Sequence, residues 1–124
     1  MIPSDYPSPD GKYCLQCLPV EMRMSHWLAL PRLIESSTQN VLLDLSASLW
    51  SVQRFQWVDR SHLLLELRCY PGEVPMVVVT IDLLKRAVSV RSPGRGGSVL
   101  LKKLPDWLQS YAQDQDSLPA AERE

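Results

Sequence analysis

Residues 62–70 alternate apolar and polar side chains more regularly than any other part of the chain. Leu63, Leu65 and Leu67 fall on one side of this alternation, which is the period of a β-strand with one buried face. The next apolar segment, residues 76–83, is rich in β-branched side chains and predicts a largely buried strand. A turn at residues 71–73 would join the two strands. We therefore expect antiparallel strands at the centre of the fold.

Shorter runs of the same kind predict further strands on both sides of this pair. Pro31 lies inside one run, and a proline within a strand indicates a sheet edge or a bulge. In another run, strict alternation places Val52, Arg54 and Gln56 on the face opposite Phe55. These runs cover residues 12–17, 27–35, 41–45, 52–58 and 87–91.

One helix is predicted near the C-terminus. Leu104, Trp107, Leu108 and Tyr111 recur at the spacing of one helical face, and Pro105 suits its first turn. The 124 residues are 45% hydrophobic and 22% charged, which is typical of one ordinary folded domain. We expect an extended arm over residues 1–11, a β-rich domain with the helix over residues 12–113, and an acidic flexible tail over residues 114–124.

The predicted fold class is all-β, with about six or seven strands in antiparallel meander sheets, sandwich-like or blade-like, and one C-terminal helix. The apolar sides of the strands and of the helix should form its core. The expected core residues are Tyr13, Leu15, Trp27, Leu43, Leu45, Trp57, Leu63, Leu65, Leu67, Val77, Val79, Ile81, Trp107 and Leu108.

Two turns of the sequence resemble each other and a known repeat. Residues 8–13 read Ser-Pro-Asp-Gly-Lys-Tyr, and residues 57–63 look like a degraded second copy that lacks the Pro and the Gly. The first is similar to the turn that opens strands in bacterial β-propeller repeats. The resemblance implies two blade-like sheets, packed as a sandwich or completed by dimerisation, because two blades cannot close a ring. Residues 21–27 are also similar to a segment of a small bacterial family, a likeness that implies no function.

The charges are balanced overall and segregated along the chain. Thirteen basic and fourteen acidic residues give a net charge of -1, which argues against nucleic acid as a partner. Three cysteines and a beginning unlike a signal peptide predict a cytoplasmic protein with reduced thiols. No apolar run reaches the roughly 20 residues needed to cross a bilayer, so we expect no membrane contact.

A metal or redox site is not expected. Cys14 and Cys17 have the Cys-x-x-Cys spacing, but an odd spacing along a strand points the two thiols to opposite faces. Only Cys69, His26 and His62 remain as further soft ligands, so we interpret the cysteines as ordinary buried or half-buried side chains.

A hydrolase site is not expected either. Ser25, His26 and Glu21 supply the right residue types, but neighbours in a strand face opposite ways and no Gly-x-Ser-x-Gly motif is present. We interpret residues 20–26 as a strand with one polar face, and we expect no catalytic residue and no cofactor.

One anion-binding site is a candidate. No acidic residue interrupts residues 85–103, and glycine amides in residues 91–98 could converge on a phosphate. The alternative is a surface hairpin with solvated charges. The candidate ligands are Arg91, Arg95, Lys102 and Lys103.

The four tryptophans, Trp27, Trp50, Trp57 and Trp107, are expected in the core or in subunit contacts. Together with the segregated charge they favour a non-catalytic bacterial protein-binding module, either an adaptor or an immunity protein that neutralises a toxin. Its partner would be another protein, with a toxin and a second copy of the chain as candidates. The alternative is a small anionic-ligand-binding domain that uses residues 85–103, and an enzyme is the third option.

Overall fold

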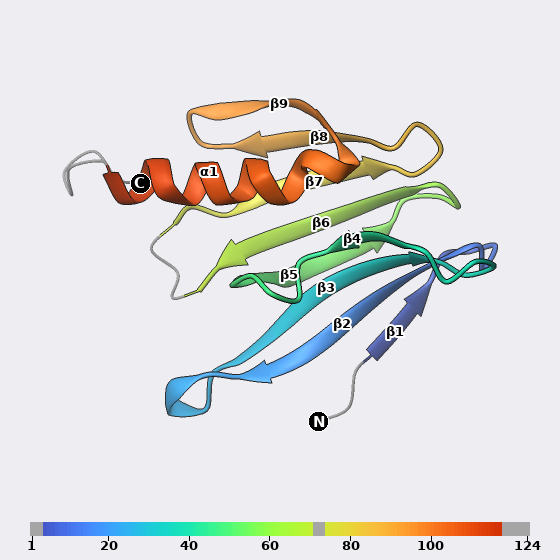
Figure 1. Cartoon of the computed structure of the whole chain (residues 1–124), viewed down its shortest axis with the longest axis horizontal. Coiled ribbons are helices and arrows are strands. Elements are labelled where there is room, and N and C mark those ends of the chain that lie inside the picture. The colour runs from blue at the N-terminus through green and yellow to red at the C-terminus, as the bar shows by residue number, and fades with distance from the viewer. Residues whose placement is uncertain (1–3, 71–73, 118–124) are drawn as a thin grey trace.

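The computed structural model describes residues 4–70 and 74–117, which form two antiparallel meander sheets and one C-terminal α-helix. In both sheets the strand order follows the chain order (Figure 1). The first sheet contains β1 (Ser4–Pro7), β2 (Tyr13–Glu21), β3 (Trp27–Glu35) and β4 (Val41–Asp44). The second contains β5 (Trp50–Trp57), β6 (His62–Cys69), β7 (Val77–Asp82), β8 (Ala87–Ser92) and β9 (Arg95–Leu100). The sandwich-like, all-β prediction is confirmed.

The helix α1 (Leu104–Ser117) lies in front of the second sheet and follows a short 3-10 turn, η2 (Leu101–Lys103) (Figure 1). Leu104, Leu108 and Tyr111 are fully buried, so the helical face predicted from their spacing is the face that packs on the sheet. The helix continues past Gln113, where the tail was expected to begin, and residues 118–124 lie outside the described part of the chain. In residues 4–70 and 74–117, no helix is long and apolar enough to cross a bilayer.

Two of the nine strands in the described residues were not predicted as strands. Residues 4–7 of the expected arm pair with β2, and residues 95–100 form β9, which agrees with the surface-hairpin interpretation of this segment. Pro93 and Gly94 reverse the chain between Ser92 and Arg95, and Gly94 has the positive φ of 72° that such a tight turn favours in glycine. The glycine-rich composition therefore produces a hairpin rather than a loose segment.

Residues 22–26 are a turn, so the predicted polar strand face is wrong. The backbone N–H of Met22 donates to the His26 carbonyl at 2.6 Å, and η1 (Arg23–Ser25) lies between them. Met24 adopts a left-handed φ of 60°, which reverses the chain direction between β2 and β3. The side chain of Ser25, which was weighed as part of a hydrolase site, is outside the described residues, as is the turn expected at residues 71–73.

The core contains the apolar rows predicted from the sequence, with three exceptions. Trp27 is 47% exposed, and Trp57 and Trp107 are only partly buried. Trp50 is buried in their place, beside Tyr111 at a ring-centroid distance of 6.5 Å. Because the buried residues of both sheets and of α1 form one cluster, the two sheets share a single interior.

Candidate binding cleft between the two sheets

The first half of β3 lies beside β5 without forming a strand ladder with it. β4 pairs with β3 only from Arg32 to Ile34, which leaves the edge of β3 before Pro31 facing β5. The Ala29 N–H donates to the Ser51 hydroxyl at 2.9 Å, and Ser51 is itself buried. Pro31, which lacks an N–H, sits where the pairing with β4 ends, so its interpretation as an edge position fits the register.

A second contact joins the sheets further along β5. The indole N–H of Trp57 donates to the Tyr6 carbonyl at 3.0 Å. The rings of Tyr6 and Phe55 lie 4.5 Å apart at a tilt of 48°. This aromatic pair links β1 to β5, two segments that are far apart in the sequence.

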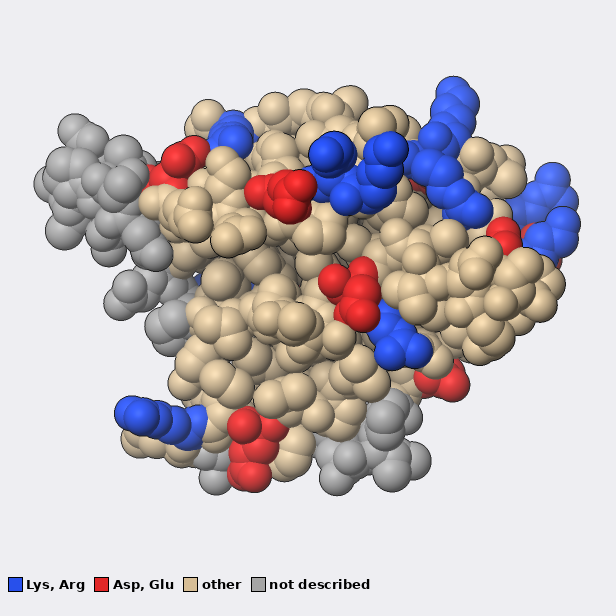
Figure 2. All heavy atoms as spheres, viewed as in Figure 1, with Lys and Arg blue, Asp and Glu red and all other residues tan. Residues whose placement is uncertain are grey.

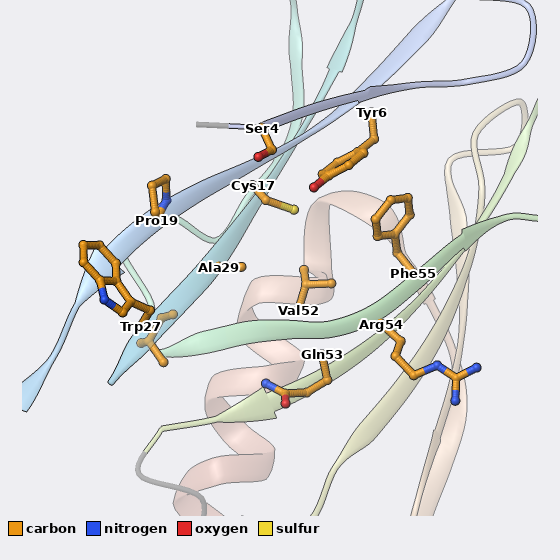
Figure 3. Close-up of a pocket in the computed structure, with 11 residues that line it drawn as sticks. Ser4, Tyr6, Cys17, Pro19, Trp27, Ala29, Val52, Gln53, Arg54 and Phe55 are labelled. Carbon is orange, nitrogen blue, oxygen red and sulfur yellow. The ribbon is translucent and has the colours of Figure 1, made fainter. Parts of the chain in front are cut away.

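Between these two contacts the sheets enclose an open cleft of about 370 Å³ (Figure 3). Side chains from β1, β2 and β3 line one wall, and consecutive residues of β5 line the other. The cleft residues are Ser4, Tyr6, Cys17, Pro19, Trp27, Leu28, Ala29, Val52, Gln53, Arg54 and Phe55.

A β-bulge shapes the β5 wall. Val52 pairs with Leu67 and Arg54 pairs with Glu66, so Gln53 is an extra residue with no partner on β6. The bulge puts Val52 on the same face as Phe55, whereas strict alternation predicted opposite faces. Figure 3 shows Val52 and Phe55 pointing into the cleft and Arg54 pointing away from it.

The thiol at the base of the cleft is not poised for nucleophilic chemistry. Burial raises the pKa of Cys17 above its ordinary value, and burial likewise raises the pKa of Cys14. Both thiols therefore stay protonated at neutral pH, and they are free rather than bonded to each other. Across residues 4–70 and 74–117, no group of three His, Cys, Asp or Glu side chains is placed to hold a metal ion.

Comparison of the chain with protein-family models, with curated proteins and with solved structures finds no match. The likeness to propeller repeats stays a prediction.

The four residues of the predicted anion site do not lie together. Arg91 is on the outer face of the second sheet, because its neighbour Val90 is buried on the inner face. Arg95 is on the inner face, with its guanidinium 5.1 Å from the Trp107 ring and its N–H groups donating to Asp114 and, at 3.4 Å, to Ser110.

The other two predicted ligands lie elsewhere again. Lys102 and Lys103 are exposed in η2, at the end of β9 opposite Arg95. Gly96 and Gly97 pair with Arg91 and Val90 in the β8–β9 ladder, so their position in the hairpin does not create an anion nest.

A third cluster surrounds His62 on the outer face of the second sheet. Nδ1 of His62 lies 2.9 Å from the Asp59 carboxylate, and Nε2 lies 3.4 Å from the Asp82 carboxylate. The hydrogen bond to Asp59 is the main cause of a raised His62 pKa. Ser61 Oγ is 3.2 Å from the same Nδ1, but that nitrogen already bonds the Asp59 carboxylate at 2.9 Å and is therefore a poor base for the hydroxyl.

Sequence reasoning missed the cleft because it depends on contacts between distant segments. Tyr6 was assigned to the arm, and no local pattern places it against Phe55. The bulge is visible in the sequence pattern of β5. Its apolar side chains have even residue numbers at Trp50 and Val52 and odd residue numbers at Phe55 and Trp57, so the alternation shifts by one residue.

Proposed function

We propose that this protein is a non-catalytic protein-binding module that holds an extended apolar segment of a partner protein in the cleft between its two sheets. The observation that carries the proposal is the edge of β5. β5 pairs with β6 on one side. On its other side β3 lies alongside near Ser51, but in the described part of the chain no strand forms a ladder there. That edge runs along the apolar cleft through Val52 and Phe55.

An unpaired strand edge can add an extended peptide as a further strand. Backbone hydrogen bonds then supply affinity, and pockets that take alternate side chains supply specificity. The cleft volume of about 370 Å³ is within the usual range for binding sites. Tyr6, Val52 and Phe55 would surround an apolar side chain inserted between the sheets.

The rim of the cleft has the composition of a protein interface. Trp27 lines the mouth and is 47% exposed, and Met24 in the adjoining β2–β3 turn is 95% exposed. Aromatic residues and methionine are enriched in interface centres, where they bury large apolar areas at small cost in entropy. Both an adaptor and an immunity protein would use such a surface.

The proposal is tested with a library of synthetic peptides about six residues long, the usual length of a strand. Binding is measured by fluorescence anisotropy of labelled peptides against the wild-type protein and Ala29→Glu, which places a carboxylate in the cleft. Val58→Ala, which alters an exposed apolar residue outside the cleft lining, is the matched control. We expect Ala29→Glu to weaken the best apolar peptides at least about tenfold and Val58→Ala to leave their affinity unchanged.

The strand-addition geometry is tested by the peptide backbone. Consecutive N–H groups of a strand point to opposite edges, so N-methylation at every second residue removes the donors of one edge only. One methylation phase should abolish binding and the other should preserve it. Equal effects of the two methylation phases would show that the peptide does not add to β5 as a strand. Equal binding by wild type and Ala29→Glu would show that the cleft is not the site.

A further inference from the structure

A second pocket, of about 420 Å³, lies where β4 meets η2 on the side of the basic segment. Four apolar and two cationic residues line it: Val41, Leu42, Leu100, Leu101, Arg86 and Lys102. Val41 is 49% exposed and Leu100 is 53% exposed, so the pocket has an apolar rim open to solvent. None of these residues lines the inter-sheet cleft.

Arg86 is held in this pocket at a conformational cost. It is in the turn between β7 and β8 with a φ of 54°, a left-handed conformation that an arginine rarely adopts. Its carbonyl accepts the Leu101 N–H at 2.8 Å, and its guanidinium lies 5.9 Å from the Tyr13 ring. Nη2 is 3.5 Å from the Glu35 carboxylate, so the side chain spans both sheets.

One donor of this guanidinium is left without an acceptor. Nη1 of Arg86 is buried and has no hydrogen-bond partner among the described residues. Leaving a buried charged donor unpaired is unfavourable, and most such groups in folded proteins are satisfied. The rest of the side chain is accessible, since Arg86 is 42% exposed and lines the pocket, so an anionic group bound there would pair with the accessible part of the guanidinium.

We propose that this pocket binds a small amphiphile made of an aliphatic chain and one terminal carboxylate. The carboxylate would accept from Arg86 and pair with Lys102, while the chain packs against Leu42 and Leu101. Glu35 offsets one of the two cationic charges, so the site carries a single net positive charge and matches a monocarboxylate better than a phosphate dianion. Figure 2 shows lysine and arginine side chains near the start of α1, beside acidic side chains.

The ligand chemistry is tested by calorimetric titration with decanoate below the concentration at which it forms micelles, with decanol within its aqueous solubility, and with acetate. We expect decanoate to bind, with affinity rising about threefold per methylene along the series from hexanoate. Decanol should bind at least about tenfold more weakly, because its hydroxyl carries no charge to pair with Arg86 and Lys102. Decanol binding as tightly as decanoate, or no binding of any carboxylate in the series, would overturn the proposal.

The residues are tested by three variants titrated with decanoate. Arg86→Asn removes the charge while placing a residue that accepts the left-handed backbone, so the fold should keep its thermal stability. We expect Arg86→Asn and Lys102→Ser to weaken decanoate binding about tenfold. Lys103→Ser removes the same charge from an exposed neighbour that does not line the pocket, and should leave the affinity unchanged.

The site is separated from the inter-sheet cleft by a cross-test. Ala29→Glu should bind decanoate like the wild type even if it no longer binds peptides, and methyl resonances of Val41 and Leu100 should shift on titration. Shifts confined to Val52 and Leu28, or equal loss of affinity in Lys102→Ser and Lys103→Ser, would contradict this assignment. Failure of the peptide experiments leaves the pocket proposal standing, because the two use different residues.

Discussion

Four aspartates, Asp10, Asp44, Asp59 and Asp82, hold four turns of this protein in the same way. The side-chain carboxylate of each accepts the backbone N–H of the residue two positions later, the geometry of an Asx turn. The bonds reach Lys12 at 3.1 Å, Ser46 at 2.9 Å, Ser61 at 2.9 Å and Leu84 at 3.1 Å. Because the charged carboxylate is the better acceptor, hydrogen bonds lower the pKa of all four aspartates. The largest cause is the Lys12 N–H for Asp10, the Ser46 hydroxyl for Asp44, the Ser61 N–H for Asp59 and the Lys85 N–H for Asp82.

At this scale the pH dependence of folding is predictable. The hydrogen bond to Asp59 raises the His62 pKa above its ordinary 6.5, so the stabilisation from charged His62 is complete below pH 6.5 and is lost as the pH rises through the raised value. The lowered pKa values of Asp59 and Asp82 act in the opposite direction. Their stabilisation is present above 3.8 and is lost as the pH falls through the lowered values.

Thermal unfolding followed by circular dichroism from about pH 4 to about pH 9 should therefore show a falling midpoint on the alkaline side. His62→Gln should remove the part of this fall that belongs to the imidazole. His26→Gln, which changes a histidine in the β2–β3 connection, is the matched control and should keep the fall. An unchanged alkaline profile in His62→Gln would contradict the assignment.

At the scale of elements, the bulge in β5 decides the shape of the cleft. The inner-facing side chains of β5 on either side of Gln53 pair with the buried Leu67, Leu65 and Leu63 of β6. Without the extra residue the strand would alternate regularly and still keep Val52 and Phe55 on the inner face. With residue 53 present, the bulge keeps Val52 and Phe55 on the same face, and it also bends β5 beside the cleft.

Deletion of single residues from β5 tests this interpretation. Removing Gln53 should convert the bulge into a regular ladder and change the free energy of unfolding by less than about 1 kcal/mol. Removing Gln56, in the regular part of the strand, moves Trp57 to the outer face and should cost about 3 kcal/mol or more. Both values come from urea denaturation, and equal destabilisation by the two deletions would show that the bulge is required for folding.

At the scale of the whole molecule, both sheets and α1 depend on one hydrophobic interior. Leu15 and Leu33 of the first sheet belong to the same buried cluster as Leu65 of the second sheet and Leu108 of the helix. The hydrogen bonds between Ala29 and Ser51 and between Trp57 and Tyr6 add direct links. The sheets should therefore unfold together rather than as separate units.

Shortening a buried side chain of α1 tests this cooperativity. Leu108→Ala removes a fully buried side chain and should lower the free energy of unfolding by about 2–5 kcal/mol. Transitions followed by far-ultraviolet circular dichroism and by tryptophan fluorescence should remain coincident. Gln109→Ala, at the exposed next position, should change stability by less than about 0.5 kcal/mol. Separated transitions would show that the first sheet is independent of the helix.

Much of the fold was predictable because its elements have strong local patterns. The alternation around Leu63, Leu65 and Leu67 and the spacing of Leu104 and Leu108 identified the central strand and the helix. β1 and β9 were missed because their pairing partners, rather than their own composition, make them strands. The cleft was not predictable, because contacts between segments far apart in the sequence form it. The predicted anion site did not assemble, because its cationic residues face in different directions once the β8–β9 hairpin forms.

The sequence by itself determined which face of most strands and of the helix would be buried, because burial follows the two-residue and 3.6-residue periods of local structure. Tertiary structure decided where those elements meet. It packed the Tyr6 ring against the Phe55 ring and opened a cleft beside β5. It also brought Arg86 and Lys102 to the lining of one pocket, with one donor of Arg86 unpaired. These juxtapositions depend on how two sheets pack around a shared interior, and no local period records that geometry.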